Sequence, residues 1–236
     1  MSNKIGIGVC TYNRANLLKK SLTELLKYAF KEAKIVVASD GSTDNTLAVI
    51  KKLGVPGISG PNEGPGRNKN RLLKALSDCD HIFIVEDDFL FFKCGWEKLY
   101  IAANKASDIQ HFTFSPPGRY GKCVATSNFG NICIQHAEMD GGAFSYYSKK
   151  VLKKCGGFCK EFKGCGWEHC EYSERIHRAG LTGKYKNNHL HEIMEYAMLM
   201  PEVNSVISLK DRADDHVRNH EIWFRSRREK WINCPL

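Results

Sequence analysis

The sequence predicts an α/β fold with a central, mostly parallel sheet. Short apolar segments alternate with segments of helical periodicity, as in repeated β-α-β units. Residues 82–85 (Ile-Phe-Ile-Val) are apolar throughout, which is typical of a strand buried on both faces of a parallel sheet. Three carboxylates, Glu86, Asp87 and Asp88, follow this strand directly. Open α/β sheets bind ligands at the carboxyl ends of their strands, so this stretch predicts a site as well as a fold.

The amino-terminal part of the chain has the pattern strand, helix, strand, helix. In residues 4–10 Ile and Val alternate with small residues, and residues 35–38 are mostly β-branched, so both segments are expected to be strands. Leucines at helical spacing follow the first strand, and Asn16 can cap that helix. Thr43 or Asp44 can cap a second helix after the second strand.

The remaining elements are predicted from loop signals, such as clusters of Gly and Pro, and from the spacing of apolar residues. Residues 60–66 are too rich in Gly and Pro for regular structure. Beyond this loop, a basic helix is expected over residues 67–76. Further helices are expected over 96–106 and 168–179, and another is expected to begin at residue 149. Short strands are expected over 109–114, 123–126 and 131–136.

Composition limits the class of protein. The chain has 236 residues, of which 42% are hydrophobic, so one domain with one sizeable core is expected. Its formal net charge of +9 favours anionic partners, without choosing among nucleotides, nucleic acid and anionic surfaces. No apolar run approaches the length of a membrane span and the start of the chain lacks a signal-peptide profile, so a soluble, cytoplasmic protein is expected.

The ten cysteines are expected to be free thiols. The tightest group, at 155, 159, 165 and 170, lacks the paired C-x2-C spacing of zinc sites. Cys10, Cys94, Cys123 and Cys133 lie in or beside apolar stretches, as small core residues do.

Six motifs in order resemble the glycosyltransferases of family 2, which have the GT-A fold. They are CTYNR (10–14), ASDGSTDNT (38–46), GPGRNKNR (64–71), VEDD (85–88), GGAF (141–144) and GGFCKEFKGCGWEHCEYSERIHRAG (156–180). The resemblance implies one GT-A domain over 1–236. Its parts would be a nucleotide-sugar-binding half (1–90), an acceptor half (91–192) and a basic, helical carboxyl-terminal extension (193–236).

The resemblance also implies a donor site. Thr11, Tyr12 and Arg14 would contact the nucleotide, and Asp40 would accept the N3–H of uracil. A base-reading carboxylate needs a fixed depth, which the end of a strand supplies. Arg67 would approach the diphosphate.

The acidic stretch corresponds to the DxD-type metal element of the family. By this correspondence Asp88 binds a divalent ion directly, while Asp87 contacts the ribose or shares the ion, with Glu86 behind them. Oxygen ligands suit Mn²⁺ or Mg²⁺. A histidine ligand is expected later in the chain, where His191 is preferred to His189.

The catalytic base is expected in the segment 166–169 (Gly-Trp-Glu-His). His169 replaces the usual aspartate of the family, which leaves Glu168, His169 and, one helical turn on, Glu171 as candidates. Trp167 would stack on a sugar ring or belong to the core. Gly142, beside Gly141, would allow the backbone to approach donor or acceptor closely.

Together these features imply a metal-dependent, inverting transferase that moves a sugar from a UDP-sugar to an acceptor hydroxyl. The acceptor is expected to be a bacterial-type glycan, a glycolipid or a hydroxymethylated base in DNA. The alternatives are a sugar-phosphate nucleotidyltransferase and a non-catalytic, basic nucleic-acid-binding protein. The basic run at 225, 227, 228 and 230 is either a solvated helix face or a contact for an anionic surface or nucleic acid.

Overall fold

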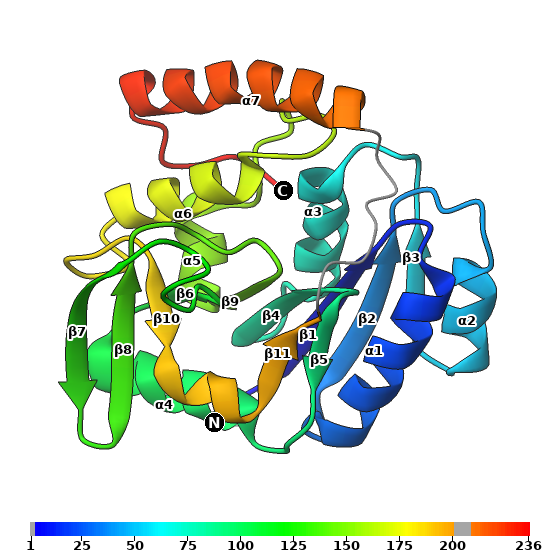
Figure 1. Ribbon diagram of the computed structural model, residues 1–236, viewed down its shortest axis with the longest axis horizontal. Helices are drawn as coiled ribbons and strands as arrows, with labels where there is room; N and C mark the ends of the chain where they lie inside the picture. The colour runs from blue at the N-terminus through cyan, green and yellow to red at the C-terminus, as the bar shows by residue number, and fades with distance from the viewer. Residues whose placement is uncertain (1–2, 201–208) are drawn as a thin grey trace.

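A six-stranded sheet with the order β3-β2-β1-β4-β9-β6 forms the centre of the protein in the computed structural model, which describes residues 3–200 and 209–236 (Figure 1). The first four strands in this order are parallel, whereas β9 is antiparallel to both of its neighbours. The prediction of a mostly parallel sheet is therefore confirmed. The strands are β1 (Ile5–Thr11), β2 (Lys34–Ser39), β3 (Gly57–Ser59), β4 (His81–Glu86), β6 (His111–Thr113) and β9 (Phe144–Ser148).

The strand β4 is buried on both faces, as its apolar sequence predicted. Phe83 and Val85 belong to one apolar cluster, and Ile82 and Ile84 belong to the other. All four side chains are at most 2% exposed. The alternation places one cluster on each side of the sheet, because successive side chains of a strand point to opposite faces.

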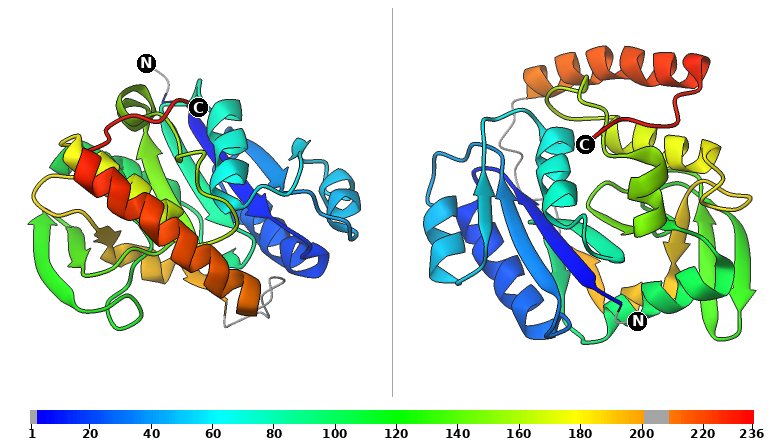
Figure 2. Two further views of the ribbon diagram at one scale, coloured as in Figure 1. Left: turned by 90° about the horizontal axis from the view of Figure 1, so that it is seen from above. Right: turned by 180° about the vertical axis from the view of Figure 1, so that it is seen from behind.

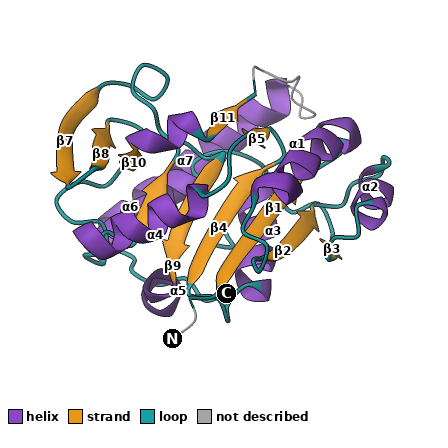
Figure 3. Cartoon of the chain, turned by 90° about the horizontal axis from the view of Figure 1, so that it is seen from below, coloured by secondary structure: helices purple, strands orange, loops and turns teal. Residues whose placement is uncertain are grey.

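Helices cover both faces (Figures 1 and 3). Buried residues of α1, α2 and α4 join the cluster of Phe83, and those of α3, α5 and α6 join the cluster of Ile82. The helices are α1 (Ala15–Tyr28), α2 (Thr46–Lys52), α3 (Pro65–Ala75), α4 (Trp96–Ser107), α5 (Lys149–Cys155), α6 (Glu168–Arg178) and α7 (Leu209–Glu229).

Two small sheets complete the fold. One has the order β10-β8-β7, and the other pairs β11 with β5. The second sheet follows the acidic stretch, and Met200 donates its backbone N–H to the carbonyl of Asp88. The chain thus returns to the acidic stretch before it reaches α7. The elements are β5 (Phe89–Phe91), β7 (Cys123–Phe129), β8 (Ile132–Ala137), β10 (Asn188–Leu190), the 3-10 helix η1 (His191–Glu195) and β11 (Ala197–Leu199).

The carboxyl-terminal helix α7 packs across α6 and the loop before it (Figure 2). Ser226 donates to Glu171 of α6, and Trp223 stacks on Trp167 with ring centroids 4.8 Å apart. The arginines of the basic run contact carboxylates of the protein itself: Arg225 contacts Glu161, Arg227 contacts Glu174 and Arg228 contacts Glu229. Part of the basic run therefore holds α7 in place.

The structure corrects several local expectations. Five strands were not expected: β3, β5, β9, β10 and β11. Four of them have only three residues, too few for a periodic signal. The fifth, β9, is a buried strand that begins at Phe144, the last residue of the GGAF motif. Asn16 does not cap α1, because the helix begins at Ala15 and Asp44 accepts the N–H of Ala15. Cys94 and Cys123 are exposed, so they are not the core residues that were expected. All ten cysteines lie within the described residues and are free thiols, as expected. Within the described residues no helix is long and apolar enough to cross a membrane.

Candidate active site

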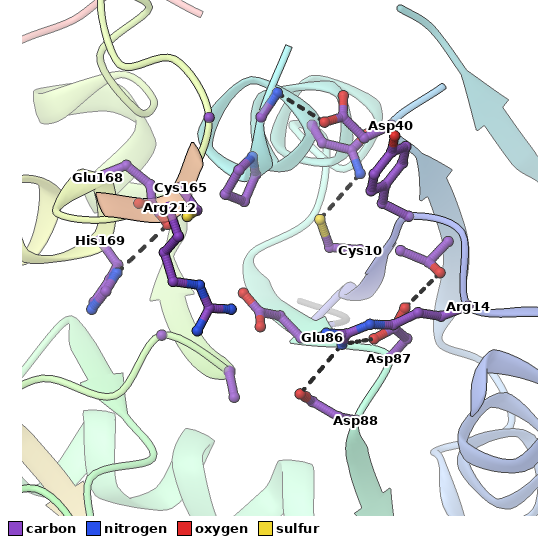
Figure 4. A pocket seen from close by; sticks show the side chains of 18 of the residues that line it. Cys10, Arg14, Asp40, Glu86, Asp87, Asp88, Cys165, Glu168, His169 and Arg212 are labelled. Atoms are coloured by element: carbon purple, nitrogen blue, oxygen red, sulfur yellow. Dashed lines mark hydrogen bonds and ion pairs between the residues drawn. The ribbon is translucent and has the colours of Figure 1, made fainter. Parts of the chain in front are cut away.

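A cavity of about 390 Å³ opens at the carboxyl ends of β1, β2 and β4 (Figure 4). The loops after these strands supply one wall, and the start of α6 supplies the opposite wall. Segments far apart in the sequence therefore share one cavity. The chemically important residues in its lining are Thr11, Tyr12, Arg14, Asp40, Glu86, Asp87, Asp88, Gly142, Glu168, His169 and Arg212.

Two aspartates form an acidic corner of this cavity. Thr11 Oγ1 donates to Asp87 Oδ2 at 2.6 Å, and Arg14 Nη1 donates to Asp87 Oδ1 at 3.0 Å. Arg14 Nη1 also lies 3.6 Å from Asp88 Oδ2. Burial raises the pKa of Asp87 to about 6, although Thr11 and Arg14 act in the opposite direction. Burial and the charges of Glu86 and Asp87 raise the pKa of Asp88 to about 6, so the corner favours added positive charge.

The corner fits a divalent cation that also binds a diphosphate. Asp88 Oδ1 is buried and has no hydrogen-bond partner among the described residues, which leaves one carboxylate oxygen for an ion. Residues 3–200 and 209–236 contain no group of three or more His, Cys, Asp or Glu side chains that could hold a metal. Mg²⁺ is usually bound by one or two carboxylates together with substrate phosphates and water, and this corner offers that donor set.

Asp40 occupies the end of β2, as predicted, and its carboxylate is strongly hydrogen-bonded. Oδ2 accepts the backbone N–H of Gly64 at 2.8 Å, and Oδ1 accepts that of Glu63 at 3.1 Å. Arg71 Nη1 also donates to Oδ1, at 2.9 Å. Gly64 has φ = 93°, a left-handed conformation that glycine adopts readily, so the GPG motif shapes a loop that carries these donors. The carboxylate is thereby held at a defined depth in the cavity.

Arg67 does not line the cavity. Its guanidinium donates to the carbonyl of Lys160 and to Glu63 Oε1. The arginine that contacts Asp40 is Arg71, one helical turn further along α3. The sequence motif contains both arginines, and their contacts with the loops around α3 decide which one faces the site.

Lys69 links the acidic stretch to the start of α6. Its Nζ donates to Glu86 Oε1 at 2.8 Å and to the carbonyl of Gly142 at 3.3 Å, and it lies 3.8 Å from Glu168 Oε1. The side chain is only 2% exposed. Burial would lower the pKa of Lys69, but the charges of Glu86 and Glu168 outweigh burial and raise it. No role for Lys69 was predicted from the sequence; its position beside buried Leu72 and Leu73 on α3 is the signal that could have shown its burial.

Glu168 and His169 form an ion pair at the first turn of α6. His169 Nδ1 lies 3.6 Å from Glu168 Oε1. Burial raises the pKa of Glu168, yet its contacts with His169 and Lys69 outweigh burial and lower it to about 2. Burial lowers the pKa of His169, but the neighbouring Cys170 and Glu168 raise it well above its usual range. Each member of the pair thus favours the charged form of the other.

The backbone around this pair is tightly packed. A Cβ at Gly142 would lie 3.2 Å from the His169 ring, and a Cβ at Gly66 would lie 3.3 Å from Glu168. Gly142 thus allows close approach, although the group that approaches it is His169. Glu168 Oε2 is buried without a hydrogen-bond partner among the residues described, so one oxygen of this carboxylate keeps unused hydrogen-bonding capacity.

The other candidates lie elsewhere. Glu171 is fully buried and forms an ion pair with Arg175, in which Nε and Oε1 are 2.9 Å apart. Trp167 is not among the residues that line the cavity; it stacks on Trp223 of α7, which leaves it the packing role that the sequence allowed. His189 is buried and accepts the N–H of Ser115, and His191 is exposed at the start of η1. Neither histidine lines the cavity.

Solved structures with the same architecture identify the fold. Staphylococcus aureus TarS in complex with UDP aligns with a TM-score of 0.53 at 22% identity, covering 74% of this chain and 55% of that chain. The Pyrobaculum calidifontis mannosyltransferase PcManGT, in complex with GDP-Man and Mn²⁺, aligns with a TM-score of 0.55 at 17% identity. The alignment covers 76% of this chain and 53% of that chain. GalNAc-T7, in complex with UDP, GalNAc and Mn²⁺, aligns with a TM-score of 0.63 at 10% identity. The alignment covers 79% of this chain and 42% of that chain. These low identities establish the fold alone, which is the GT-A fold of glycosyltransferases.

The family follows from the sequence match. A family model described as Glycosyl transferase family 2 matches residues 7–155, more than half of the chain. The protein belongs to this family and is a glycosyltransferase, which favours sugar transfer over the two alternative functions.

Two curated relatives agree. An uncharacterized glycosyltransferase, R363, of Acanthamoeba polyphaga mimivirus is 26% identical over 187 residues, covering 73% of this chain and 72% of the relative. The GalNAc(5)-diNAcBac-PP-undecaprenol beta-1,3-glucosyltransferase of Campylobacter jejuni is 32% identical over 94 residues, which is 37% of this chain and 30% of the relative. The chain thus spans less than a third of the second relative.

Proposed function

We propose that the protein transfers a sugar from a UDP-sugar to a hydroxyl of a glycan or glycolipid, with inversion and with a divalent metal ion. The observation that carries this proposal is the meeting of three kinds of group in one cavity. Asp40, the pair Asp87 and Asp88, and Glu168 lie at three separate sides of it. A nucleotide sugar presents a base, a diphosphate and an anomeric carbon, and each part has a group of suitable chemistry among these three.

Asp88 and Asp87 are the proposed metal ligands, with Mn²⁺ or Mg²⁺ as the ion. A divalent ion held by these carboxylates would supply positive charge to offset the negative charge that grows on the diphosphate as the glycosidic bond breaks. Arg14 contacts both carboxylates and keeps them together at the edge of the sheet. The third expected ligand, His191, is exposed outside the cavity lining and stays a prediction.

Glu168 is the proposed base. Contacts with His169 and Lys69 lower the pKa of Glu168 and so favour its carboxylate form, whereas the neighbouring Glu168 raises the pKa of His169 and favours its protonated form. Inversion requires a single displacement, in which the acceptor oxygen attacks the anomeric carbon while one base takes its proton. Glu168 Oε2 is the atom proposed to take this proton, and His169 and Lys69 hold the carboxylate in place.

The proposed donor nucleotide and acceptor rest on chemistry and on the relatives. TarS and GalNAc-T7 were solved with UDP, whereas PcManGT was solved with GDP-Man, so UDP is the proposal and GDP the comparison. The Campylobacter relative is named for a lipid-linked glycan, which supports a glycan or glycolipid acceptor. Neither this relative nor TarS is named for a modified base in DNA, so that acceptor gains no support.

Thermal unfolding with nucleotides and metal tests the proposal. UDP with Mn²⁺ should raise the Tm of the wild type, GDP should do so less, and a chelator should abolish the effect. Asp88→Asn should lose the metal-dependent shift, while Asp78→Asn, a control at an exposed surface aspartate, should keep it. A panel of UDP-sugars, assayed for hydrolysis with and without glycan acceptors, then identifies the sugar. A wild type whose Tm responds to neither nucleotide would refute the donor assignment.

A further inference from the structure

One face of α7 is fixed to the loop that leads into Glu168. Asp215 Oδ2 accepts the backbone N–H of Cys165 at 3.0 Å. Asn219, which is fully buried, donates to the carbonyls of Lys163 at 2.9 Å and Gly166 at 3.1 Å. Asp215 and Asn219 are four residues apart and therefore lie on the same face of the helix.

The packing between this face and the loop leaves no room for a further side chain. A Cβ at Gly164 would overlap the carboxylate of Asp215, and a Cβ at Gly166 would lie 2.7 Å from the His216 ring. Both glycines have positive φ, 62° and 101°, so the loop needs them for conformation as well as for space. The first turns of α7 therefore have a defined position relative to the cavity.

Arg212 lies three residues before Asp215 on this face, and it lines the cavity with Cys165 and Glu168. Figure 4 shows its side chain reaching into the cavity, with the guanidinium directed toward Glu86. Glu86 directly precedes Asp87 and Asp88. The guanidinium thus points to the part of the cavity where the proposed function places the diphosphate.

The many carboxylates around the cavity would repel a diphosphate, so a cationic side chain among them is important for its binding. Its lining contains the carboxylates of Asp40, Glu86, Asp87, Asp88 and Glu168. Arg67, the arginine expected to approach the diphosphate, donates instead to Lys160 and Glu63. A planar guanidinium matches two phosphate oxygens with two N–H donors, so Arg212 has the chemistry that Arg67 was expected to supply.

We propose that Arg212 binds the diphosphate of the donor and the nucleoside diphosphate that leaves. The donor site is then completed by α7, which lies outside the residues matched by the family model. This inference rests on the proposed function, because it assumes a nucleoside diphosphate in the cavity. It assigns α7 a direct role in donor binding, beyond its packing on α6.

Calorimetric titration of wild type, Arg212→Ala, Arg212→Lys and Lys210→Ala with UDP, UMP and uridine, in the presence of Mn²⁺, tests the proposal. Lys210→Ala is the matched control, since it removes a charge from the same turn of α7 at an exposed residue outside the cavity lining. Arg212→Ala should weaken UDP binding by about ten- to a hundredfold, the range for losing a charged hydrogen-bond donor. Uridine binding should change less than about twofold, and Arg212→Lys should recover part of the UDP affinity.

The outcomes separate this inference from the function on which it rests. A wild type that binds no UDP overturns both. A wild type that binds UDP while Arg212→Ala binds it equally well overturns the role of Arg212 and leaves the proposed function intact. Equal losses of UDP and uridine affinity, or equal losses in Lys210→Ala, would show a general effect of α7 and would also overturn it.

Discussion

Replacement of Lys69 by Met tests whether the buried ammonium holds the two halves of the site together. Methionine keeps most of the apolar stem and removes the charge. The substitution leaves Glu86 without its 2.8 Å partner and removes the cation that lies 3.8 Å from Glu168. Lys69 is 2% exposed, so water cannot simply replace it.

The cost can be estimated from these contacts. Removing one partner of a buried ion pair costs about 3–5 kcal/mol of unfolding free energy. The Glu86 side chain is 32% exposed and regains some hydration, which favours a value of about 3 kcal/mol. For a domain of this size that corresponds to a fall in Tm of about 6–12 °C. The pKa of Glu168 should also rise, because the charge of Lys69 is one of the causes that lower it.

The assay is thermal unfolding followed by circular dichroism. Lys74→Met is the matched control, since Lys74 is exposed on the same helix, and it should shift the Tm by at most about 2 °C. Adding Glu86→Gln to Lys69→Met should recover part of the loss, because an unpaired carboxylate then disappears. The stabilising role of Lys69 is refuted if Lys69→Met melts within about 2 °C of the wild type, or if Lys74→Met loses as much.

Two further predictions concern single side chains. Glu168→Gln should lower kcat by about a hundred- to ten-thousandfold, because the proton acceptor is lost, while the Kd for UDP should stay unchanged. Glu221→Gln, at an exposed residue of α7, is the control, and a comparable loss of kcat in this variant would contradict the assignment of Glu168 as the base. Burial lowers the pKa of His189 from 6.5 to about 4, so the unfolded chain binds a proton that the folded protein excludes. Stability should therefore be lost as pH falls from 6.5 toward 4, and this residue should contribute about 2 kcal/mol of the loss near pH 5. In denaturant unfolding His189→Gln should flatten this dependence, and His191→Gln, at an exposed residue, should change it only slightly, because the charge of His191 is a minor cause of the His189 shift.

Much of the fold could be read from local patterns. The run 82–85 has no polar residue, and a strand with that sequence is stable only between two apolar layers, which the structure contains. Asp40, Asp87 and Asp88 each follow a strand of one parallel sheet, so their meeting at one edge follows from the order of elements along the chain.

Other features depended on contacts between distant segments. The sequence contains Arg67 and Arg71 in one motif, and only the packing of α3 shows which of them contacts Asp40. The helical spacing of Lys69 to Leu72 and Leu73 indicates its burial, but the sequence does not show its partners, Glu86 and Glu168, which stabilise the buried charge. Trp167 belongs to a motif associated with the site, yet Trp223 from α7 removes it from the cavity lining.

The sequence by itself determined the main strands and helices of the amino-terminal part of the chain and the carboxylates at the edge of its sheet. Local periodicity and the alternation of strands and helices are properties of short segments, which the sequence displays directly. The tertiary structure alone decided that Lys69 lies between Glu86 and Glu168 and that Arg212 lines the same cavity as these carboxylates. Their placement depends on packing between α3, α6 and α7, and the spacing of residues along the chain does not encode such long-range contacts.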